Sequence, residues 1–184
     1  VHRGIDIELH LAALIPATYL ADVPARLMLY KRIASAADTG ALRELQVEMI
    51  DRFGLLPVAV KNLFAVAELR LLANRIGIAR LDLGPQGGRV EFAAATRADP
   101  AVVIRMIQNQ PQRYRLDGPQ KLRILHKEEN AELRIAAARK LLDERCGASS
   151  VELAALDEHR PHDRLFATLT AQGDTALLRI TRNG

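Results

Sequence analysis

The chain has 184 residues, 49% of them hydrophobic and 26% charged, which suits one folded domain with or without an appendage and excludes a disordered chain. No apolar run approaches the length of a membrane span, and no signal-peptide pattern opens the sequence. The net charge of +4 would suit a nucleic-acid partner, but the 26 basic residues are spread along the chain and most have acids nearby, so we expect a solvated, mixed-charge surface.

The first half of the chain predicts one strand and three helices. In chain order they are a half-buried strand at 5–11 and helices at 23–36, 38–54 and 57–77. Asp22 caps the first helix, and Gly54 and Gly77 end the second and third. The third helix is apolar around most of its circumference, so we expect it to be central and the most buried.

The second half alternates hairpins with helices. We expect two short strands around a glycine-rich turn at 79–94, a helix from Asp99 to Pro111, a second hairpin at 113–125 and a last helix from about Lys127 to Cys146. The composition changes after Gly147, and residues 148–184 are predicted to be a loosely attached extension that ends in a hairpin. The fold class predicted for 1–147 is mixed α/β (α+β), with about five helices and short, mainly antiparallel strands and hairpins.

The sequence lacks the patterns that catalysis or cofactor binding would require. The stretch GPQGG at 84–88 has no Gly-x-x-x-x-Gly-Lys and precedes no helix, so we expect a hairpin turn and no ATP site. His159 and His162 are separated by a proline and have no further ligands at metal spacing, so a solvated loop is expected. Cys146 is the only cysteine, has no catalytic partner in the sequence, and indicates a reducing compartment. We predict no enzyme, no cofactor and no metal in this chain.

The helix at 38–54 carries a cluster of charges opposite its apolar stripe. At about 100° per residue, Glu44, Glu48, Asp51 and Arg52 fall together, away from the stripe of Leu42, Leu45, Met49 and Phe53. A convex helix face would keep these carboxylates ionised, which argues against acid–base catalysis. Two interpretations remain: the cluster keeps the helix soluble, or it meets a partner.

The second hairpin offers another candidate surface. Its cations alternate with apolar residues, which would place four of them on one face of the hairpin: Arg113, Arg115, Lys121 and Arg123. Such a face could lie on a phosphate backbone, or it could be the solvated side of a half-buried hairpin. Contact with DNA through 113–123 is therefore an alternative function.

Four linked segments identify a family by their order. They are LYKRIASA (29–36), VEMIDRFGLLP (47–57), NLFAVAELRLLANRIGI (62–78) and QRYRLDGPQKL (112–122). Together they resemble the C-terminal domain of bacterial transcription-repair coupling factors, from about Ile5 to Cys146. Val58 departs from the polar or acidic residue expected there, and nothing from the family carries over to 148–184. The first residue, Val1, is consistent with a piece of a longer polypeptide.

The resemblance implies a role in DNA repair. The parent resembles an ATP-driven DNA translocase of the bacterial cytoplasm that removes stalled RNA polymerase and recruits UvrA, with its ATP and Mg²⁺ sites outside this chain. The domain itself would be non-catalytic and would pack on a UvrB-like module of the same polypeptide, covering the surface for UvrA. In the family, the docking surface includes the end of the E-x-x-D-R-F-G helix, which maps to Glu48, Asp51 and Arg52. No membrane partner is implied.

Overall fold

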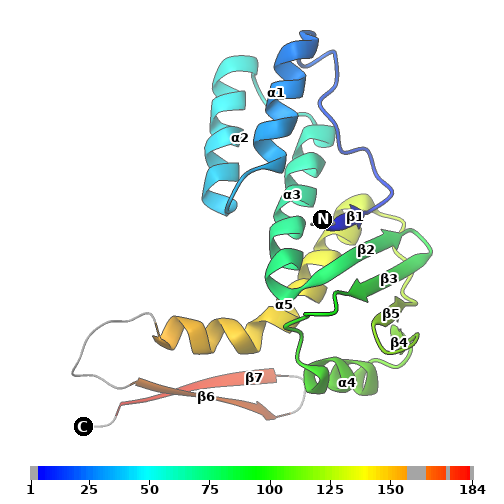
Figure 1. Cartoon of the computed structure of the whole chain (residues 1–184), viewed down its shortest axis with the longest axis vertical. Helices are drawn as coiled ribbons and strands as arrows, with labels where there is room; N and C mark the ends of the chain where they lie inside the picture. The colour runs from blue at the N-terminus through cyan, green and yellow to red at the C-terminus, as the bar shows by residue number, and fades with distance from the viewer. Residues whose placement is uncertain (1–3, 157–164, 173–174, 183–184) are drawn as a thin grey trace. The chain divides into compact units, whose positions relative to one another are not determined.

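The computed structural model describes residues 4–156, 165–172 and 175–182 and divides into two compact units, Val1–Leu142 and Asp143–Gly184. The helices are α1 Val23–Ala34, α2 Thr39–Phe53, α3 Val58–Ile76, α4 Pro100–Asn109 and α5 Ala131–Leu156 (Figure 1). The strands of the first unit are β1 Asp6–Glu8, β2 Ile78–Gly84, β3 Gly87–Phe92, β4 Tyr114–Leu116 and β5 Lys121–Ile124. The predicted α+β class, with about five helices and mainly antiparallel strands, is confirmed.

The sheet of the first unit has the strand order β1-β2-β3-β5-β4. Only β1 and β2 pair in parallel. The other neighbouring pairs, β2 with β3, β3 with β5 and β5 with β4, are antiparallel. Leu81, Val90 and Leu122, in β2, β3 and β5, face the core and are fully buried. The two residues that flank each of them in its strand are polar. This alternation gives the sheet one buried and one solvent-facing side.

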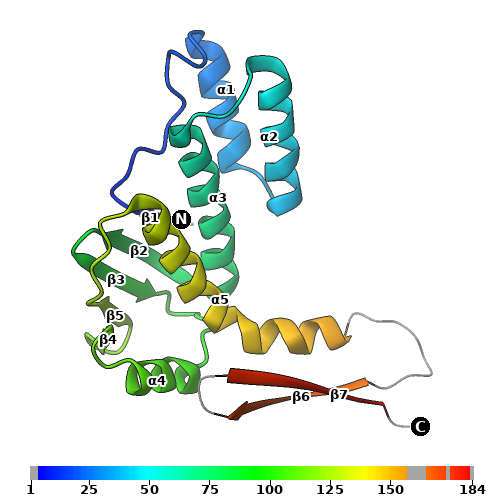
Figure 2. The same cartoon turned by 180° about the vertical axis from the view of Figure 1, so that it is seen from behind.

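Helix α3 connects the helical and the sheet parts of the first unit, as its apolar circumference predicts. Its N-terminal half contributes Val60 and Phe64 to the core formed with α1 and α2. Its C-terminal half contributes the buried Leu69, Ala73 and Ile76, and this half lies alongside the sheet in both views (Figures 1 and 2). The prediction of a central helix is confirmed.

Local sequence signals set the ends of the helices. The caps Asp22, Asp38 and Asp99 each accept a hydrogen bond of 2.8 Å from a backbone N–H in the first turn of α1, α2 and α4. Gly77 ends α3 in the left-handed conformation, with φ of 82°. At this position a Cβ would lie 2.8 Å from the Cα of Thr96, so glycine is required for packing as well as for conformation.

The predicted boundaries of two elements, the first strand and the last helix, are wrong. The strand predicted at 5–11 is restricted to Asp6–Glu8, and His10 at φ of 53° turns the chain away from the sheet. The last helix begins at Ala131 and not near Lys127, because the Asn130 side chain accepts from the N–H of Leu133 and caps the helix there. It continues past Cys146 to Leu156, through the stretch GASSVELAAL, half of which is alanine and leucine.

A buried arginine ties the chain leaving β1 to the start of α5. Arg134 is 3% exposed, and its guanidinium donates to four backbone carbonyl oxygens. They belong to Leu9 at 2.9 Å, His10 at 3.1 Å, Glu128 at 2.9 Å and Glu129 at 3.3 Å. The N-terminal strand is therefore anchored through its backbone to a helix more than 120 residues later.

The second unit contains an antiparallel pair of strands, β6 Leu165–Gln172 and β7 Thr175–Arg182. Their register runs from the pair Leu165 and Arg182 to the pair Gln172 and Thr175. Among the residues that the structure describes, every helix falls short of the length and apolarity that a bilayer crossing requires.

Candidate functional site

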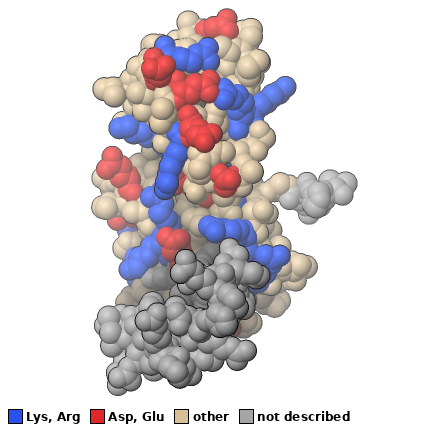
Figure 3. All heavy atoms as spheres, turned by 90° about the vertical axis from the view of Figure 1, so that its left-hand side faces the viewer, with Lys and Arg blue, Asp and Glu red and all other residues tan. Residues whose placement is uncertain are grey.

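Helix α2 presents the predicted charge cluster to solvent. Leu42, Leu45 and Met49 are buried against α1 and α3, as the apolar stripe predicts. Glu44, Asp51 and Arg52 are exposed and Glu48 is partly exposed. Figure 3, which views the molecule from the α2 side of Figure 1, shows acidic and basic side chains intermingled. We refer to Glu44, Val47, Glu48, Asp51 and Arg52 as the α2 face.

Glu48 is the most strongly constrained residue of the α2 face. Both terminal nitrogens of Arg32 in α1 donate to its two carboxylate oxygens, at 2.8 and 2.7 Å, and Arg52 donates to it at 3.1 Å. The hydrogen bonds from Arg32, followed by that from Arg52, lower the pKa of Glu48 from 4.5 to about 2. Bidentate geometry of this kind fixes orientation as well as charge. Glu48 is thus held ionised and in one orientation.

The C-terminal end of α2 is fixed by aromatic packing. The Tyr19 and Phe53 rings meet edge to face with centroids 6.0 Å apart, and the Arg52 guanidinium carbon lies 4.9 Å from the Phe53 centroid. The Tyr19 hydroxyl donates to the carbonyl oxygens of Met49 at 3.1 Å and Gly54 at 2.9 Å. Burial raises the pKa of Tyr19, which keeps the hydroxyl a donor. Phe53 thus packs against Tyr19 and Arg52 at the end of α2.

The remaining acids of the α2 face point into solvent. Glu44 lines an open hollow of about 300 Å³ between α1 and α2, together with Arg32 and Glu48. Neither Glu44 nor Asp51 makes an ion pair within residues 4–143, whose side chains the structure describes. The Asp51 carboxylate is therefore available to an external donor.

Exposed apolar side chains accompany these charges. Val47 is 67% exposed in the middle of the α2 face, and Leu55 is 86% exposed directly after the helix ends. An apolar centre surrounded by polar groups is the usual anatomy of a protein–protein interface. The sequence analysis missed Val47, although its spacing of three residues from Glu44 and four from Asp51 makes it their neighbour on the helix surface. It also missed Arg32, whose role depends on how α1 packs beside α2.

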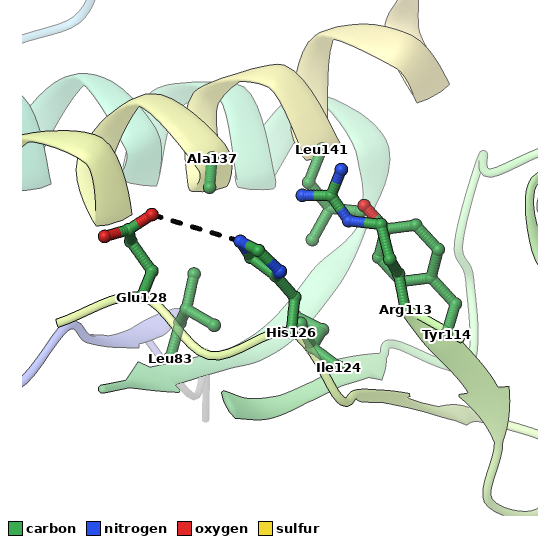
Figure 4. A pocket seen from close by; sticks show the side chains of 8 residues that line it. All are labelled: Leu83, Arg113, Tyr114, Ile124, His126, Glu128, Ala137 and Leu141. Atoms are coloured by element: carbon green, nitrogen blue, oxygen red, sulfur yellow. Dashed lines mark ion pairs between the residues drawn. The ribbon is translucent and has the colours of Figure 1, made fainter. Parts of the chain in front are cut away.

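The second candidate surface differs from its prediction at one residue. Arg115, Lys121 and Arg123 are exposed on the solvent side of the sheet, but Arg113 is not with them. Figure 4 shows Arg113 turned toward α5 and Leu141 in a small pocket. The other lining residues are Leu83, Tyr114, Ile124, His126, Glu128 and Ala137. The Nε atom of Arg113 is buried there without a hydrogen-bond partner.

Metal-ligating residues do not gather in the part of the chain with described side chains, where no group of three or more His, Cys, Asp or Glu could hold an ion. The only contact between two such side chains in the pocket of Figure 4 is a 3.9 Å approach of His126 Nε2 to Glu128. His159, His162 and the side chain of Cys146 lie outside the described residues.

Comparison with known proteins identifies the family of the chain. The sequence profile of the TRCF domain family matches residues 9–103. The chain is 51% identical over 120 residues to the transcription-repair-coupling factor of Haemophilus influenzae, covering 65% of the chain and 10% of that protein. It is 42% identical over 139 residues to the Escherichia coli protein of the same name, covering 76% of the chain and 12% of that protein.

A solved structure supports the fold. The chain is similar to a crystal structure of the C-terminal domain of transcription-repair coupling factor, with a TM-score of 0.63 and 20% sequence identity. The match covers 78% of the chain and 95% of that domain. The chain spans about a tenth of the length of the curated relatives cited above. From its sequence and its fold, the chain belongs to the TRCF domain family and corresponds to a domain of transcription-repair coupling factor.

Proposed function

We propose that this domain is a non-catalytic, autoinhibitory mask in a transcription-repair coupling factor. In this account the α2 face docks on the UvrB-like module of the same polypeptide and covers the surface that UvrA would bind. The observation that carries the proposal is the combination of a rigid helix end, an unpaired Asp51 and an exposed Val47 on one face. Family membership favours this function over a face that is merely solvated.

The residues of the α2 face have different roles in this account. Glu48 holds Arg52 and the α1–α2 pair in place, because its two oxygens already accept from Arg32 and Arg52. Asp51 has both oxygens available, so it is the residue that would accept a bidentate hydrogen bond from an arginine of the partner module. Val47 would supply the apolar contact at the centre. Truncating one partner of such a desolvated ion pair costs about 2–5 kcal/mol.

A small contact is sufficient for a mask that belongs to the same chain as its target. Linkage within one polypeptide gives an effective concentration on the order of millimolar, so even weak docking keeps the surface covered. A competitor at that surface, or a movement of the modules, would then expose it. The motor activity, with its ATP and Mg²⁺, would belong to the rest of the parent protein, as would contact with RNA polymerase.

The test is capture of UvrA by the full-length parent protein. Asp51→Arg should increase UvrA capture, because it places a cation opposite the proposed arginine donor. Glu129→Arg is the matched control, since Glu129 is also an exposed acid, near α5, whose side chain has no partner among the described residues. Capture that stays at the wild-type level with Asp51→Arg, in a protein that unfolds normally, would contradict the proposal.

A further inference from the structure

The solvent-facing side of the sheet carries charge in an ordered pattern that is separate from the α2 face. Residues directly opposite each other on neighbouring strands form rows across the sheet. One row runs through Arg115 of β4, Arg123 of β5, Arg89 of β3, Asp82 of β2 and Glu8 of β1. Its charge changes from three adjacent cations at the β4 edge to two adjacent acids at the β1 edge.

The neighbouring row is internally compensated. It runs through Lys121, Glu91, Arg80 and Asp6, so that charges of opposite sign alternate. Lys121 lies 3.8 Å from Glu91, and Arg80 lies 3.7 Å from Asp6. The cations that lie directly opposite one another on this face are therefore Arg89, Arg115 and Arg123, which we call the arginine row.

The arginine row is only partly neutralised by acids of the same face. Arg89 is 48% exposed and lies 3.6 Å from Glu91, and Arg123 is 55% exposed and lies 3.4 Å from Asp117. Arg115 is exposed and makes no ion pair with any side chain that the structure describes. Like charges directly opposite each other weaken a sheet, so folding alone does not account for three arginines in register.

We propose that the arginine row binds the sugar–phosphate backbone of duplex DNA. Neighbouring strands are about 4.8 Å apart, so the row forms a line of three guanidinium groups at right angles to the strands. Arginine donates two parallel hydrogen bonds to a phosphate, and such contacts fix position without reading sequence.

Duplex DNA fits this face better than a single strand does. Single-stranded nucleic acid is held by aromatic side chains on which its bases stack. The described residues of the solvent-facing side include no aromatic, since Tyr114 and Phe92 project to the side of the buried Leu122 and Val90. This face can therefore bind nucleic acid through contacts of its cations with the phosphate backbone, and not through base stacking.

The test is fluorescence anisotropy of a labelled 20-base-pair DNA duplex with the 184-residue chain. Three phosphate contacts predict a log–log salt slope of about −2.7, so raising salt from 50 to 200 mM should weaken binding about 40-fold. The triple variant Arg89→Gln, Arg115→Gln, Arg123→Gln should bind at least about tenfold more weakly at 50 mM salt, with a slope near zero.

A matched variant separates the arginine row from net charge. Arg43→Gln, Lys61→Gln and Arg75→Gln together remove three exposed cations of α2 and α3, so both triple variants change the net charge from +4 to +1. This control variant should retain most of the wild-type affinity for the duplex and most of the log–log salt slope. Equal weakening in both triple variants, tighter binding of a single strand than of the duplex, or no binding at 50 mM salt would each overturn the proposal. The thermal unfolding midpoint of the arginine-row variant should not fall, because repulsion within the row is relieved.

Discussion

Arg32 of α1 and Glu48 of α2 form a two-pronged ion pair, with both terminal nitrogens of the arginine donating to the two oxygens of the carboxylate at 2.8 and 2.7 Å. Because of this pair, the two acids at the E-x-x-D-R-F-G end of the helix, Glu48 and Asp51, differ in their availability to a partner. Glu48 is committed within the domain, whereas Asp51, one turn later, is exposed and uncommitted among the described residues. Charge reversal at Glu48 would therefore disturb α1 as well as docking, and Asp51 provides the cleaner functional variant.

The first prediction concerns the pH dependence of stability. The pKa of Glu48 is about 2 in the folded domain and near 4.5 when unfolded, so its ionised form stabilises the fold above about pH 4.5. This contribution is lost as the pH falls from 4.5 toward 2. Thermal unfolding midpoints measured between pH 6 and 2 should fall less steeply for Glu48→Gln than for the wild type in that window.

The control for this titration is Glu44→Gln on the same helix, which removes a carboxylate without an ion pair in the described part of the chain. Glu44→Gln should show the same fall in the thermal unfolding midpoint between pH 4.5 and 2 as the wild type. A Glu48→Gln profile parallel to that of the wild type would show that the Arg32 contact is not formed in solution.

The second prediction concerns the buried guanidinium of Arg134. Arg134→Met should lower the free energy of unfolding by about 2–4 kcal/mol, because the buried carbonyl of Leu9 and the partly buried carbonyl of His10 lose a charged donor. Arg139→Met is the matched control on the same helix, since Arg139 makes only a surface ion pair with Glu68 worth about 0–1 kcal/mol. Urea denaturation measures both, and equal losses would contradict the assigned role.

The third prediction links the packing of Tyr19 to the proposed docking. Tyr19→Phe removes the hydroxyl that donates to Met49 and Gly54 and should cost about 0.5–1.5 kcal/mol in the free energy of unfolding. Because those bonds fix the end of α2, affinity for the UvrB-like module should also fall. Loss of stability with unchanged affinity would separate the helix end from docking.

The fourth prediction concerns the apolar centre of the α2 face. Val47→Gln should change the free energy of unfolding by less than about 0.5 kcal/mol, since Val47 is 67% exposed, yet it should weaken docking. Leu133→Gln, at a 56% exposed leucine of α5, is the control and should leave docking unchanged. Equal docking by Val47→Gln and the wild type would remove Val47 from the interface.

Most helix ends were predictable from the sequence, because they depend on residues that are close together in the chain. The helices capped by Asp22, Asp38 and Asp99 begin as predicted because the cap and its N–H donor are two or three residues apart. Asn130 follows the same rule, but the acidic stretch before it gave the appearance of an earlier start. The glycine stop at Gly77 was also readable locally.

Features that depend on tertiary packing were not predictable. Arg32 and Arg134 look like ordinary helix residues in the sequence, and their partners lie 16 and about 125 residues away. Arg113 was placed with the basic hairpin by alternation, which holds only within a strand. Its N–H bonds to the carbonyl of Gln110 in the turn before β4, and that turn directs its side chain toward α5. The register that aligns Arg89 with Arg123 likewise requires the paired strands.

The most direct test of the masking account is binding of the 184-residue chain, supplied as a separate molecule, to the isolated UvrB-like module of its parent. The measurement needs high protein concentrations, because the contact is normally intramolecular. The account predicts binding that UvrA displaces, that Asp51→Arg abolishes and that Glu129→Arg preserves. Equal binding by the wild type and Asp51→Arg, or no binding by a folded wild-type chain, would contradict it.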